Sequence, residues 1–509
     1  MSLYLNDFKK LLNIEADKVN NPVVESISYD SRQVGPGCLF ICKGNAFKKS
    51  YLESAIEKGA VAYVSELDYG LGIECLKVNN IRNCLAKIAG LFYSKPQDKL
   101  KIIAITGTKG KTSTVTYIHK ILSLYNKKMG INPPALLSSS VNFDGKERAK
   151  AQLTTPEPIE LFSFMRRAVD NGVKTLVMEV SSQALKYGRC DGLRFEMAGF
   201  LNISPDHISS IEHKDFEDYF SSKLKIFKKT DWSFVNLSSD KIDRILSEAE
   251  KCNKISKLRV FKKNESFNDA DYAASNLQDD RQGFCMDLFA RKDGHLEELK
   301  KSIYVNSFGF YNAENALMAI AMTLSMGVGL SCIEEALACV DIEGRSKYFS
   351  TSDGGIKILV DYAHNGLSFS SIIKEATRRF PDRRLVAVFG ATGDKGRNRR
   401  FDLGRIAGEM ADFSYICEDD PGSEDPMDIS KSIGSAIEGK GGQYRIIINR
   451  QEAFEAAMDE AKELWNKGQK SLVMLLGKGD SDFQIEKDGK VPEISDFDKA
   501  SHWIDEFGK

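Results

Sequence analysis

Residues 102–113 read Ile-Ile-Ala-Ile-Thr-Gly-Thr-Lys-Gly-Lys-Thr-Ser, an apolar run that leads directly into a loop with two glycines. Gly107 and Gly110 let backbone N–H groups converge on a phosphate, and Lys111 adds a positive charge. The Thr112 hydroxyl can then hold Mg²⁺, and the following helix directs its positive N-terminus at the anion. An ordinary strand–turn–helix connection is the alternative. Because the loop follows a strand directly, we interpret it as a nucleoside triphosphate site.

The composition is that of a globular protein and disfavours several classes. With 509 residues, 42% of them hydrophobic and 28% charged, the chain is long enough for about three domains. A net charge of −1 gives no general attraction for nucleic acid or anionic membranes. There is no apolar run of about 18 residues, and acids and lysines occupy the N-terminus, so we expect neither a membrane span nor a secretory leader. The ten cysteines form no Cys-x-x-Cys pair, which predicts free thiols in a reducing cytoplasm and no zinc site.

Apolar runs of strand length recur along the chain, and helical patterns separate most of them. This alternation favours an α/β fold with mostly parallel sheets covered by helices. A polar segment around Pro96 and a junction near Gly344 mark linkers. The expected domains are residues 1–97, 98–342 and 343–509. Strands are expected at residues 23–29, 38–42, 60–65, 102–106, 174–180, 197–203, 356–360, 384–389, 413–417 and 472–476, and helices at 81–94 and 213–227.

Several chemically capable side chains follow the ends of these expected strands, where open parallel sheets gather functional groups. Taken alone, each one fits a helix cap or a hydrogen-bonded surface residue better than a functional role. Their shared location favours a functional role. Glu179 and His207 could supply an oxygen and a nitrogen to Mg²⁺, although magnesium prefers oxygen ligands. The candidates are Glu179, Ser181, Ser182, Asp206, His207, Asp361, His364 and Asp394.

Lys223 lies on the apolar stripe of the helix expected at 213–227, together with Phe216, Phe220 and Leu224. One interpretation is a lysine that extends along the stripe until its ammonium reaches water. The other is a lysine turned inward to meet phosphate, or one modified to become an acid. The residues alone leave both open.

A further helix opens in residues 308–316, where Asn312 and Asn315 lie one turn apart. Both amides could therefore face one planar partner such as a purine. The alternative is that Asn312 is a simple N-cap and Asn315 is incidental.

Taken together, these motifs resemble the Mur ligases, ATP-dependent enzymes that form amide bonds in bacterial cell-wall precursors. The resemblance spans nearly the whole chain, and the MurE branch, which adds the third residue of the stem peptide, is the most similar. It rests on the following segments: Gly107–Thr112, Gly309–Asn315, Gly344-Arg345, Asp361–His364, Tyr29–Arg32 with Pro36–Phe40, Thr154–Glu157 and Glu179–Ala184.

The resemblance implies an N-terminal domain that binds a UDP-sugar, a central phosphate-loop domain, and a C-terminal Rossmann-like domain. It implies a Mg²⁺ site at Thr112, Glu179, His207 and Lys223, with Lys223 carbamylated, as the pattern Tyr219-x-x-x-Lys223 suggests. The implied catalytic residues are Lys111, Lys223, Glu179 and His207. The implied ATP contacts are Gly107, Thr108, Lys109, Gly110, Lys111, Thr112, Ser113, Asn312, Asn315, Arg345, Asp361 and His364, and the implied UDP-MurNAc-dipeptide contacts are Ser31, Arg32, Thr154, Thr155, Ser181 and Arg189.

The reaction implied by the resemblance has two steps. The γ-carboxylate of UDP-MurNAc-L-Ala-D-Glu attacks the γ-phosphate of ATP, and the resulting acyl phosphate is then attacked by the amine of an incoming diamino acid. Lys111 and Mg²⁺ would neutralise the charge on the transferring group. Only small-molecule partners are expected, with no nucleic acid and no membrane, and the enzyme is expected to be a cytoplasmic monomer.

The choice of amino acid depends on residues 417–424, Cys-Glu-Asp-Asp-Pro-Gly-Ser-Glu. Relatives that use meso-diaminopimelate have Asp-Asn-Pro-Arg here, and the arginine holds a distal carboxylate. In this chain Gly422 replaces the arginine and Asp420 adds an acid, which would repel a carboxylate and attract an ammonium. L-Lysine is therefore expected, while diaminopimelate and L-ornithine stay open as alternatives. The implied amino-acid contacts are Arg400, Asp419, Asp420, Gly422, Gly477 and Asp480.

Two other function classes compete with this interpretation. One is a related ligase such as a folylpolyglutamate synthase, which the N-terminal Asp30-Ser31-Arg32 segment disfavours because that family begins near the phosphate loop. The other is a non-catalytic nucleotide-binding relative. The joint presence of Lys111, Thr112 and the implied metal ligands disfavours it.

Overall fold

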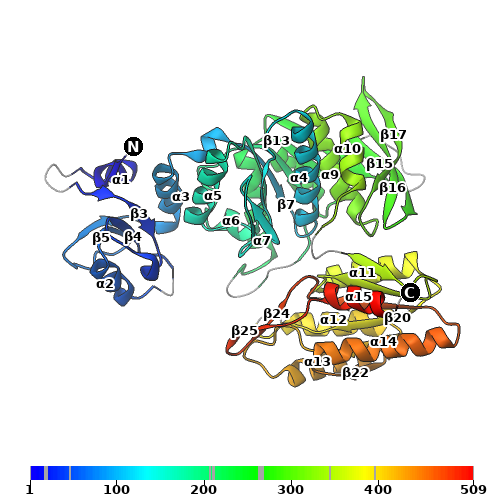
Figure 1. The fold of residues 1–509 in the computed structure, drawn as a ribbon. Coiled ribbons are helices and arrows are strands. Elements are labelled where there is room, and N and C mark those ends of the chain that lie inside the picture. The colour runs from blue at the N-terminus through cyan, green and yellow to red at the C-terminus, as the bar shows by residue number, and fades with distance from the viewer. Residues whose placement is uncertain are drawn as a thin grey trace. The chain divides into compact units, whose positions relative to one another are not determined.

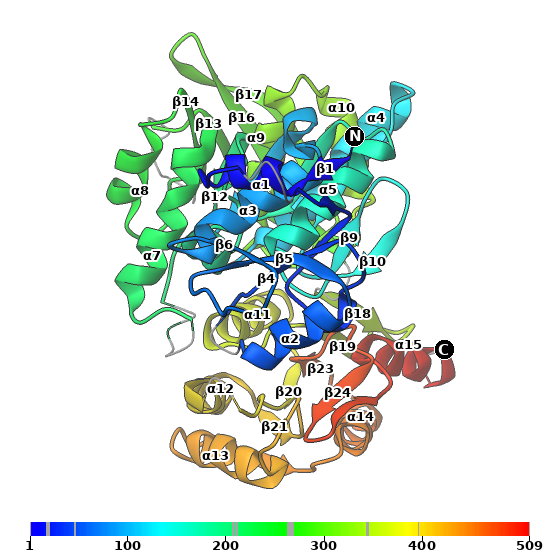
Figure 2. The ribbon, with the colours of Figure 1, turned by 90° about the vertical axis from the view of Figure 1, so that its left-hand side faces the viewer.

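A computed structural model describes residues 2–16, 21–44, 47–205, 208, 212–261, 269–342, 346–394 and 397–507. The chain divides into two compact units (Figures 1 and 2). The first comprises Met1–Ser275, Leu288–Leu299 and Glu314–Ala336, and the second Asn276–Asp287, Lys300–Ala313 and Leu337–Lys509. The expected α/β class is confirmed, since helices alternate with parallel strands in both units. The three domain boundaries stay predictions.

The N-terminal part of the first unit is built on a parallel four-stranded sheet in the order β3-β4-β5-β6. The sequence of β4 is continuously apolar, and all four of its residues are buried. Asn80 accepts a hydrogen bond from the Asn83 N–H and so caps the helix predicted at 81–94. The elements are β1 (Leu3–Tyr4), α1 (Leu5–Leu11), β2 (Val23–Val24), β3 (Ser26–Ser28), β4 (Cys38–Ile41), α2 (Lys49–Glu57), β5 (Ala60–Ser65), β6 (Glu74–Lys77) and α3 (Ile81–Phe92).

The large sheet has eleven strands in the order β10-β9-β8-β11-β7-β12-β13-β14-β15-β16-β17. β7, the strand before the phosphate loop, lies between β11 and β12 and pairs in parallel with both. Its strands are β7 (Lys101–Thr106), β8 (Ala135–Leu137), β9 (Val141–Phe143), β10 (Arg148–Lys150), β11 (Thr175–Glu179), β12 (Phe195–Phe200), β13 (Thr230–Asn236), β14 (Lys254–Val260), β15 (Tyr272–Asp280), β16 (Gly283–Lys292) and β17 (His295–Val305). The helices of this region are α4 (Lys111–Lys128), α5 (Pro158–Asp170), α6 (Ser182–Lys186), α7 (Phe216–Leu224), α8 (Ile242–Ala249), α9 (Asn312–Ser325) and α10 (Leu330–Ala338).

The C-terminal sheet has six strands in the order β18-β19-β23-β20-β21-β22, all parallel except β18. Alternate residues of its strands enter two separate cores. One core contains α11, α12 and α13, and the other contains α14 and α15, so helices cover both faces. The elements are β18 (Lys347–Ser350), β19 (Ile356–Asp361), α11 (Gly366–Arg379), β20 (Arg384–Phe389), α12 (Arg397–Met410), β21 (Phe413–Ile416), α13 (Pro426–Glu438), β22 (Tyr444–Ile446), α14 (Arg450–Asn466), β23 (Ser471–Leu476), β24 (Phe483–Glu486), β25 (Gly489–Pro492) and α15 (Asp496–Phe507).

Within the residues that the structure describes, no helix combines the length and hydrophobicity needed to cross a bilayer. The ten cysteines are free thiols, as expected.

Candidate active site

The phosphate loop connects β7 to α4 as the sequence predicts. Gly107 has φ +157° and Gly110, which precedes the first residue of α4, has φ +82°. The Thr108 N–H donates to the Asn202 carbonyl (3.0 Å) and the Lys109 N–H to Asn202 Oδ1 (2.9 Å). Lys111 Nζ donates to the carbonyls of Gly107 (2.8 Å) and Thr108 (3.2 Å). The loop therefore has a fixed backbone with a lysine ammonium folded over it.

Asn315 on α9 packs directly against this loop. A Cβ on Gly110 would lie 2.1 Å from Asn315 Oδ1, so the close approach requires glycine. Asn312 instead donates its side-chain amide to the Phe308 carbonyl, 2.9 Å away. The two amides thus have different neighbours. Their predicted role in binding a nucleotide base stays a prediction.

Lys223 is turned inward, which decides between the two orientations that the sequence left open. Its side chain is 2% exposed and Nζ donates to the Gly107 carbonyl at 2.8 Å. The neighbouring Tyr219 hydroxyl donates to Thr108 Oγ1 (3.0 Å). Two ammonium groups, those of Lys111 and Lys223, therefore donate to the carbonyl oxygen of Gly107.

Glu179 ends β11 beside β7, and its carboxylate is 1% exposed. The Ser139 N–H donates to one carboxylate oxygen (2.7 Å) and the Ser139 hydroxyl to the other (3.1 Å). Thr112, in the first turn of α4, is also buried. His207 and Asp206 lie outside the described residues, and no cluster of three His, Cys, Asp or Glu side chains suited to a metal occurs among the residues that are described.

A connected set of groups forms at the carboxyl end of β11. The fully buried Thr155 hydroxyl donates to the Glu179 carbonyl (2.9 Å) and accepts from the Ser181 N–H (3.0 Å). Ser181 caps α6, and Thr154 Oγ1 lies 3.0 Å from Ser139 Oγ. Arg189 donates to the Thr155 carbonyl (2.9 Å) and pairs with Glu157 (2.7 Å).

The N-terminal candidates lie on an exposed turn. Arg32 is 86% exposed and forms an ion pair with Asp30. This hydrogen-bonded pair lowers the pKa of Asp30 to about 2. Ser31 begins the same turn, and its carbonyl accepts from Lys58 Nζ (2.8 Å). A freely accessible guanidinium could meet a phosphate or sugar ligand.

Asp361 ends β19, and its Oδ2 accepts from the Ser346 N–H (2.8 Å) and hydroxyl (2.6 Å). His364 Nδ1 lies 2.8 Å from the Tyr362 carbonyl oxygen. Gly344 and Arg345 lie outside the described residues.

Three loops of the C-terminal sheet converge on Asp419, which follows β21. The carboxyl group of Asp419 is 3% exposed, and it has no hydrogen-bond partner among the residues that the structure describes. A Cβ on Gly477, after β23, would lie 2.5 Å from Asp419 Oδ2, and a Cβ on Gly390, after β20, would lie 3.0 Å from Asp419 Cβ. Burial raises the pKa of Asp419 to about 6. Such a buried carboxylate fits a cationic ligand.

Asp420 does not offer the free acid that the sequence argument assumed. Its carboxylate accepts from Lys478 Nζ (2.7 Å) and from the Ile485 N–H (2.9 Å). Lys478, which the sequence argument did not single out, is 3% exposed. The Asp420–Lys478 pair links the loop after β21 to the loop after β23. We therefore interpret Asp420 as a residue that stabilises the two loops.

Arg400 and Gly422 lie in the neighbouring part of this region. Arg400 is buried and pairs with Glu424 (2.8 Å), while its Nε has no hydrogen-bond partner within the described ranges. Gly422 has φ +60°, and a Cβ there would lie 2.0 Å from Asp394 Oδ2. The carboxylate of Asp394 thus occupies the space that a side chain at position 422 would need. Asp480 is exposed.

Comparisons with known proteins agree on one family. The Mur ligase middle domain matches residues 105–323, and the Mur ligase glutamate ligase domain matches residues 344–479. A Streptococcus mutans protein named UDP-N-acetylmuramoyl-L-alanyl-D-glutamate–L-lysine ligase is 36% identical over 490 residues, which cover 96% of this chain and 94% of that protein.

Two solved structures show that the fold is shared. A UDP-N-acetylmuramoyl-L-alanyl-D-glutamate–2,6-diaminopimelate ligase has a TM-score of 0.66 at 24% identity, with 99% of each chain covered. A folylpolyglutamate synthase from Mycobacterium tuberculosis has a TM-score of 0.62 at 17% identity, with 77% of this chain and 92% of the other covered.

Proposed function

The chain belongs to the Mur ligase family, and from this premise we propose that it joins L-lysine to UDP-MurNAc-L-Ala-D-Glu at the expense of ATP. The observation that carries the proposal is the 36% identity, along 96% of the chain, to a ligase named for L-lysine. The two domain matches extend from the phosphate loop to the loop at Gly477. We further propose that the enzyme works as a cytoplasmic monomer and that its domains are residues 1–97, 98–342 and 343–509.

In the first step, a carboxylate oxygen of the D-glutamate side chain attacks the γ-phosphorus of ATP, and the bond to ADP breaks. The N–H groups of residues 107–113 and the Lys111 ammonium hold the phosphates. They stabilise the negative charge that spreads over the transferring group. Arg189, Thr154 and Ser181 hold the dipeptide, and Ser31 and Arg32 hold the UDP-sugar. Asn312, Asn315, Arg345, Asp361 and His364 complete the ATP contacts.

The donors around the phosphate loop fit a magnesium ion. Thr112 and Glu179 are buried oxygen donors, which suit this hard cation. Thr112, Glu179, His207 and a carbamylated Lys223 would hold it. When bound, Mg²⁺ neutralises phosphate charge.

The position of Lys223 supports its proposed carbamylation. Its buried Nζ and that of Lys111 both donate to the Gly107 carbonyl at 2.8 Å, so Lys223 lies at the phosphate loop. A neutral amine can add CO₂, which forms an N–C bond and releases a proton. The resulting carbamate is an anion that would suit the metal. Activity of the enzyme therefore depends on dissolved bicarbonate.

In the second step, the lysine amine attacks the acyl carbon and phosphate leaves. The unpartnered Arg400 Nε supports a role for Arg400 in binding the α-carboxylate. The unpartnered, buried Asp419 supports a role in binding an ammonium group. Gly422, Gly477 and Asp420 shape this subsite. Water must be excluded, because it would hydrolyse the acyl phosphate.

The test is phosphate release by the purified protein with ATP, Mg²⁺ and UDP-MurNAc-L-Ala-D-Glu, with product masses determined. L-Lysine, L-ornithine and meso-diaminopimelate are supplied in parallel, and bicarbonate is varied. We expect turnover with L-lysine and none with L-ornithine or meso-diaminopimelate. Turnover with diaminopimelate would keep the ligase class and refute the choice of amino acid. No turnover with any of the three would refute the proposed function.

A further inference from the structure

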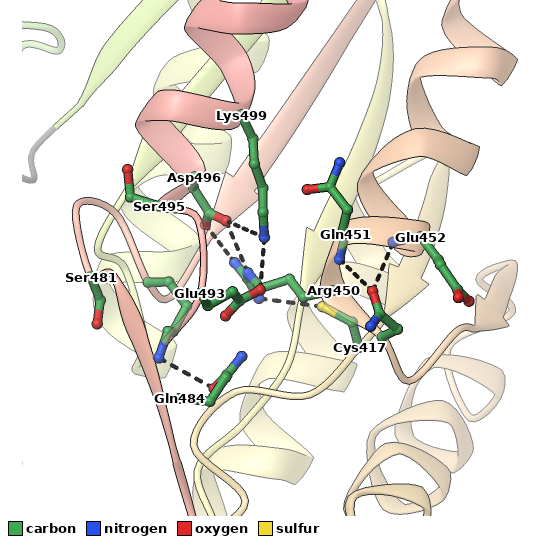
Figure 3. A network of polar contacts seen from close by, with 12 residues as sticks. Cys417, Arg450, Gln451, Glu452, Ser481, Gln484, Glu493, Ser495, Asp496 and Lys499 are labelled. Atoms are coloured by element: carbon green, nitrogen blue, oxygen red, sulfur yellow. Dashed lines mark hydrogen bonds and ion pairs between the residues drawn. The ribbon is translucent and has the colours of Figure 1, made fainter. Parts of the chain in front are cut away.

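A buried ion pair lies behind the proposed amino-acid subsite. Arg450 is 1% exposed, and it donates to both carboxylate oxygens of Asp496, at 3.0 and 2.6 Å. Lys499 lies next to it and pairs with Glu493 (2.7 Å) (Figure 3). Arg450 is the first residue of α14, where the positive helix end disfavours a cation. A cation at such an unfavourable position suggests a role beyond stability.

The remaining hydrogen bonds of Arg450 reach the ends of two strands. Nη2 donates to the Leu476 carbonyl at the end of β23 (3.0 Å). Nη1 lies 3.3 Å from Cys417 Sγ, just after β21, a contact drawn in Figure 3. These strands are not neighbours, because β20 lies between them. One side chain thus connects two loops that the sheet itself does not join.

Both loops belong to the proposed subsite. Cys417 is two residues before Asp419, and Leu476 directly precedes Gly477. The spacing between these loops matters, since Asp419 Oδ2 lies where even a methyl group on Gly477 would not fit. Small displacements of a binding group at this range lower affinity strongly.

Arg450 also acts on Asp419 by its charge. Burial raises the pKa of Asp419, whereas Arg450 and Lys478 lower it, and Asp420 and Asp496 raise it. The effect of Arg450 exceeds that of Asp496. Removal of the pair should therefore make Asp419 easier to protonate.

We propose that Arg450 is a positioning residue for the amino-acid substrate: held by Asp496, its guanidinium joins the loops after β21 and β23 and fixes Asp419 beside Gly477. The inference rests on the proposed function, because it assigns to Arg450 the support of that lysine subsite.

The main test variant is Arg450→Met together with Asp496→Leu. Removing both charges avoids leaving one of them buried alone, so the fold should persist. We expect the KM for L-lysine to rise about tenfold or more, as for loss of a charged hydrogen bond. The KM values for ATP and UDP-MurNAc-L-Ala-D-Glu should stay within about twofold, because Arg450 touches neither proposed site. The rise in lysine KM at low pH should begin at a higher pH than in the parent.

A matched control is Arg384→Met with Glu460→Leu. This pair (3.0 Å) also joins the sheet to α14, but Arg384 lies at the amino end of β20, away from the loops. Its lysine KM should equal that of the parent. Arg450→Lys is a second variant that tests the inference. It keeps a charge near Asp496 but lacks the fork needed for both loops, so its lysine KM should also rise.

An unchanged lysine KM in either Arg450 variant would overturn the inference. So would a parallel change in all three KM values and kcat that follows the fall in melting temperature. Failure of the parent enzyme to use L-lysine would instead refute the proposed function.

Discussion

At the scale of single residues, Asp419 is the side chain whose buried carboxylate is proposed to bind an ammonium group of lysine. Asp419→Asn keeps the shape of the side chain and removes its charge. We expect the lysine KM to rise about 10- to 100-fold, the amount typical of a hydrogen bond to a charged group. The KM values for ATP and the UDP-linked substrate should not change. In the parent, lysine KM should rise as the pH falls through about 6, because Asp419 then takes up a proton.

Asp419 should also affect stability, with a defined sign. Its pKa is about 6 in the folded chain and about 3.9 in an unfolded one. The folded state therefore binds more protons between these values, and stability rises as the pH falls from about 6 to about 4. The melting temperature of the parent relative to Asp419→Asn should show this gain, and should be constant above about pH 7. A difference that does not vary with pH would contradict the assignment.

Gly422 was the sequence's main argument for lysine, and the structure shows a second reason for glycine at this position. Gly422→Ala must accept a φ of +60° and a Cβ 2.0 Å from Asp394 Oδ2. Gly441→Ala is the matched control, since its φ is +76° but its surroundings are open. We expect strain of about 1–2 kcal/mol in both variants. Thermal unfolding should show a further loss only for Gly422→Ala.

The predicted clash at residue 422 also affects how a variant designed to change the amino-acid substrate must be interpreted. Gly422→Arg would carry the same clash with Asp394, so poorer use of lysine could come from the distorted loop alone. The lysine KM and kcat of Gly422→Ala are therefore the values with which those of Gly422→Arg should be compared. Equal stability of the two alanine variants would mean that Asp394 does not fill the space beside residue 422.

Some site residues were predictable because their motif is local. The phosphate loop is a contiguous string, and Glu179 ends an apolar run as predicted. The apolar stripe singled out Lys223, but its inward orientation is known only from the structure. Lys478 and Arg450 were not predicted. Their partners lie 58 and 46 residues away, so only the folded chain shows them.

At the scale of elements, buried parallel strands were predicted best. The bounds of β5 and β20 agree with the prediction, because each has five consecutive apolar residues with one polar residue at an end, Ser65 or Arg384. The Lys- and Glu-rich stretch 289–301 was not among the expected strands. It contributes to β16 and β17, and β17 is exposed over most of its length. A strand that buries little apolar surface carries no hydrophobic pattern from which to predict it.

The junction of β7 and α4 gives a prediction at this scale. Gly110→Ala would place a Cβ 2.1 Å from Asn315 Oδ1 and impose a φ of +82°, so either the Asn315 amide or the start of α4 must shift. Because the N–H groups there are proposed to hold phosphate, the KM for ATP should rise about tenfold or more. Gly130→Ala, after the other end of α4, has a φ of +69° and open space around it. Its KM for ATP should match that of the parent. Equal effects of the two substitutions would show that strain alone is responsible.

At the scale of the whole molecule, the fold places the two halves of the proposed chemistry on separate sheets. Lys111 and the phosphate loop follow β7 of the eleven-stranded sheet. Asp419 follows β21 of the six-stranded sheet, and Arg400 lies on α12, which packs against that sheet. The fold class could be predicted from the alternation of strands and helices. The domain boundaries depend on where packing between segments stops, and they stay predictions.

This division of labour makes the two half-reactions separable by mutation. Arg400→Met should abolish amide formation with L-lysine but still allow the acyl phosphate to form, because no phosphate contact is removed. Hydroxylamine can trap that intermediate as a hydroxamate of UDP-MurNAc-L-Ala-D-Glu, detectable by mass. Lys111→Met should form neither product, since the charge that stabilises the transferring phosphoryl group is lost. Hydroxamate from Lys111→Met, or none from Arg400→Met, would contradict the assignment of phosphoryl transfer to one sheet and amine binding to the other.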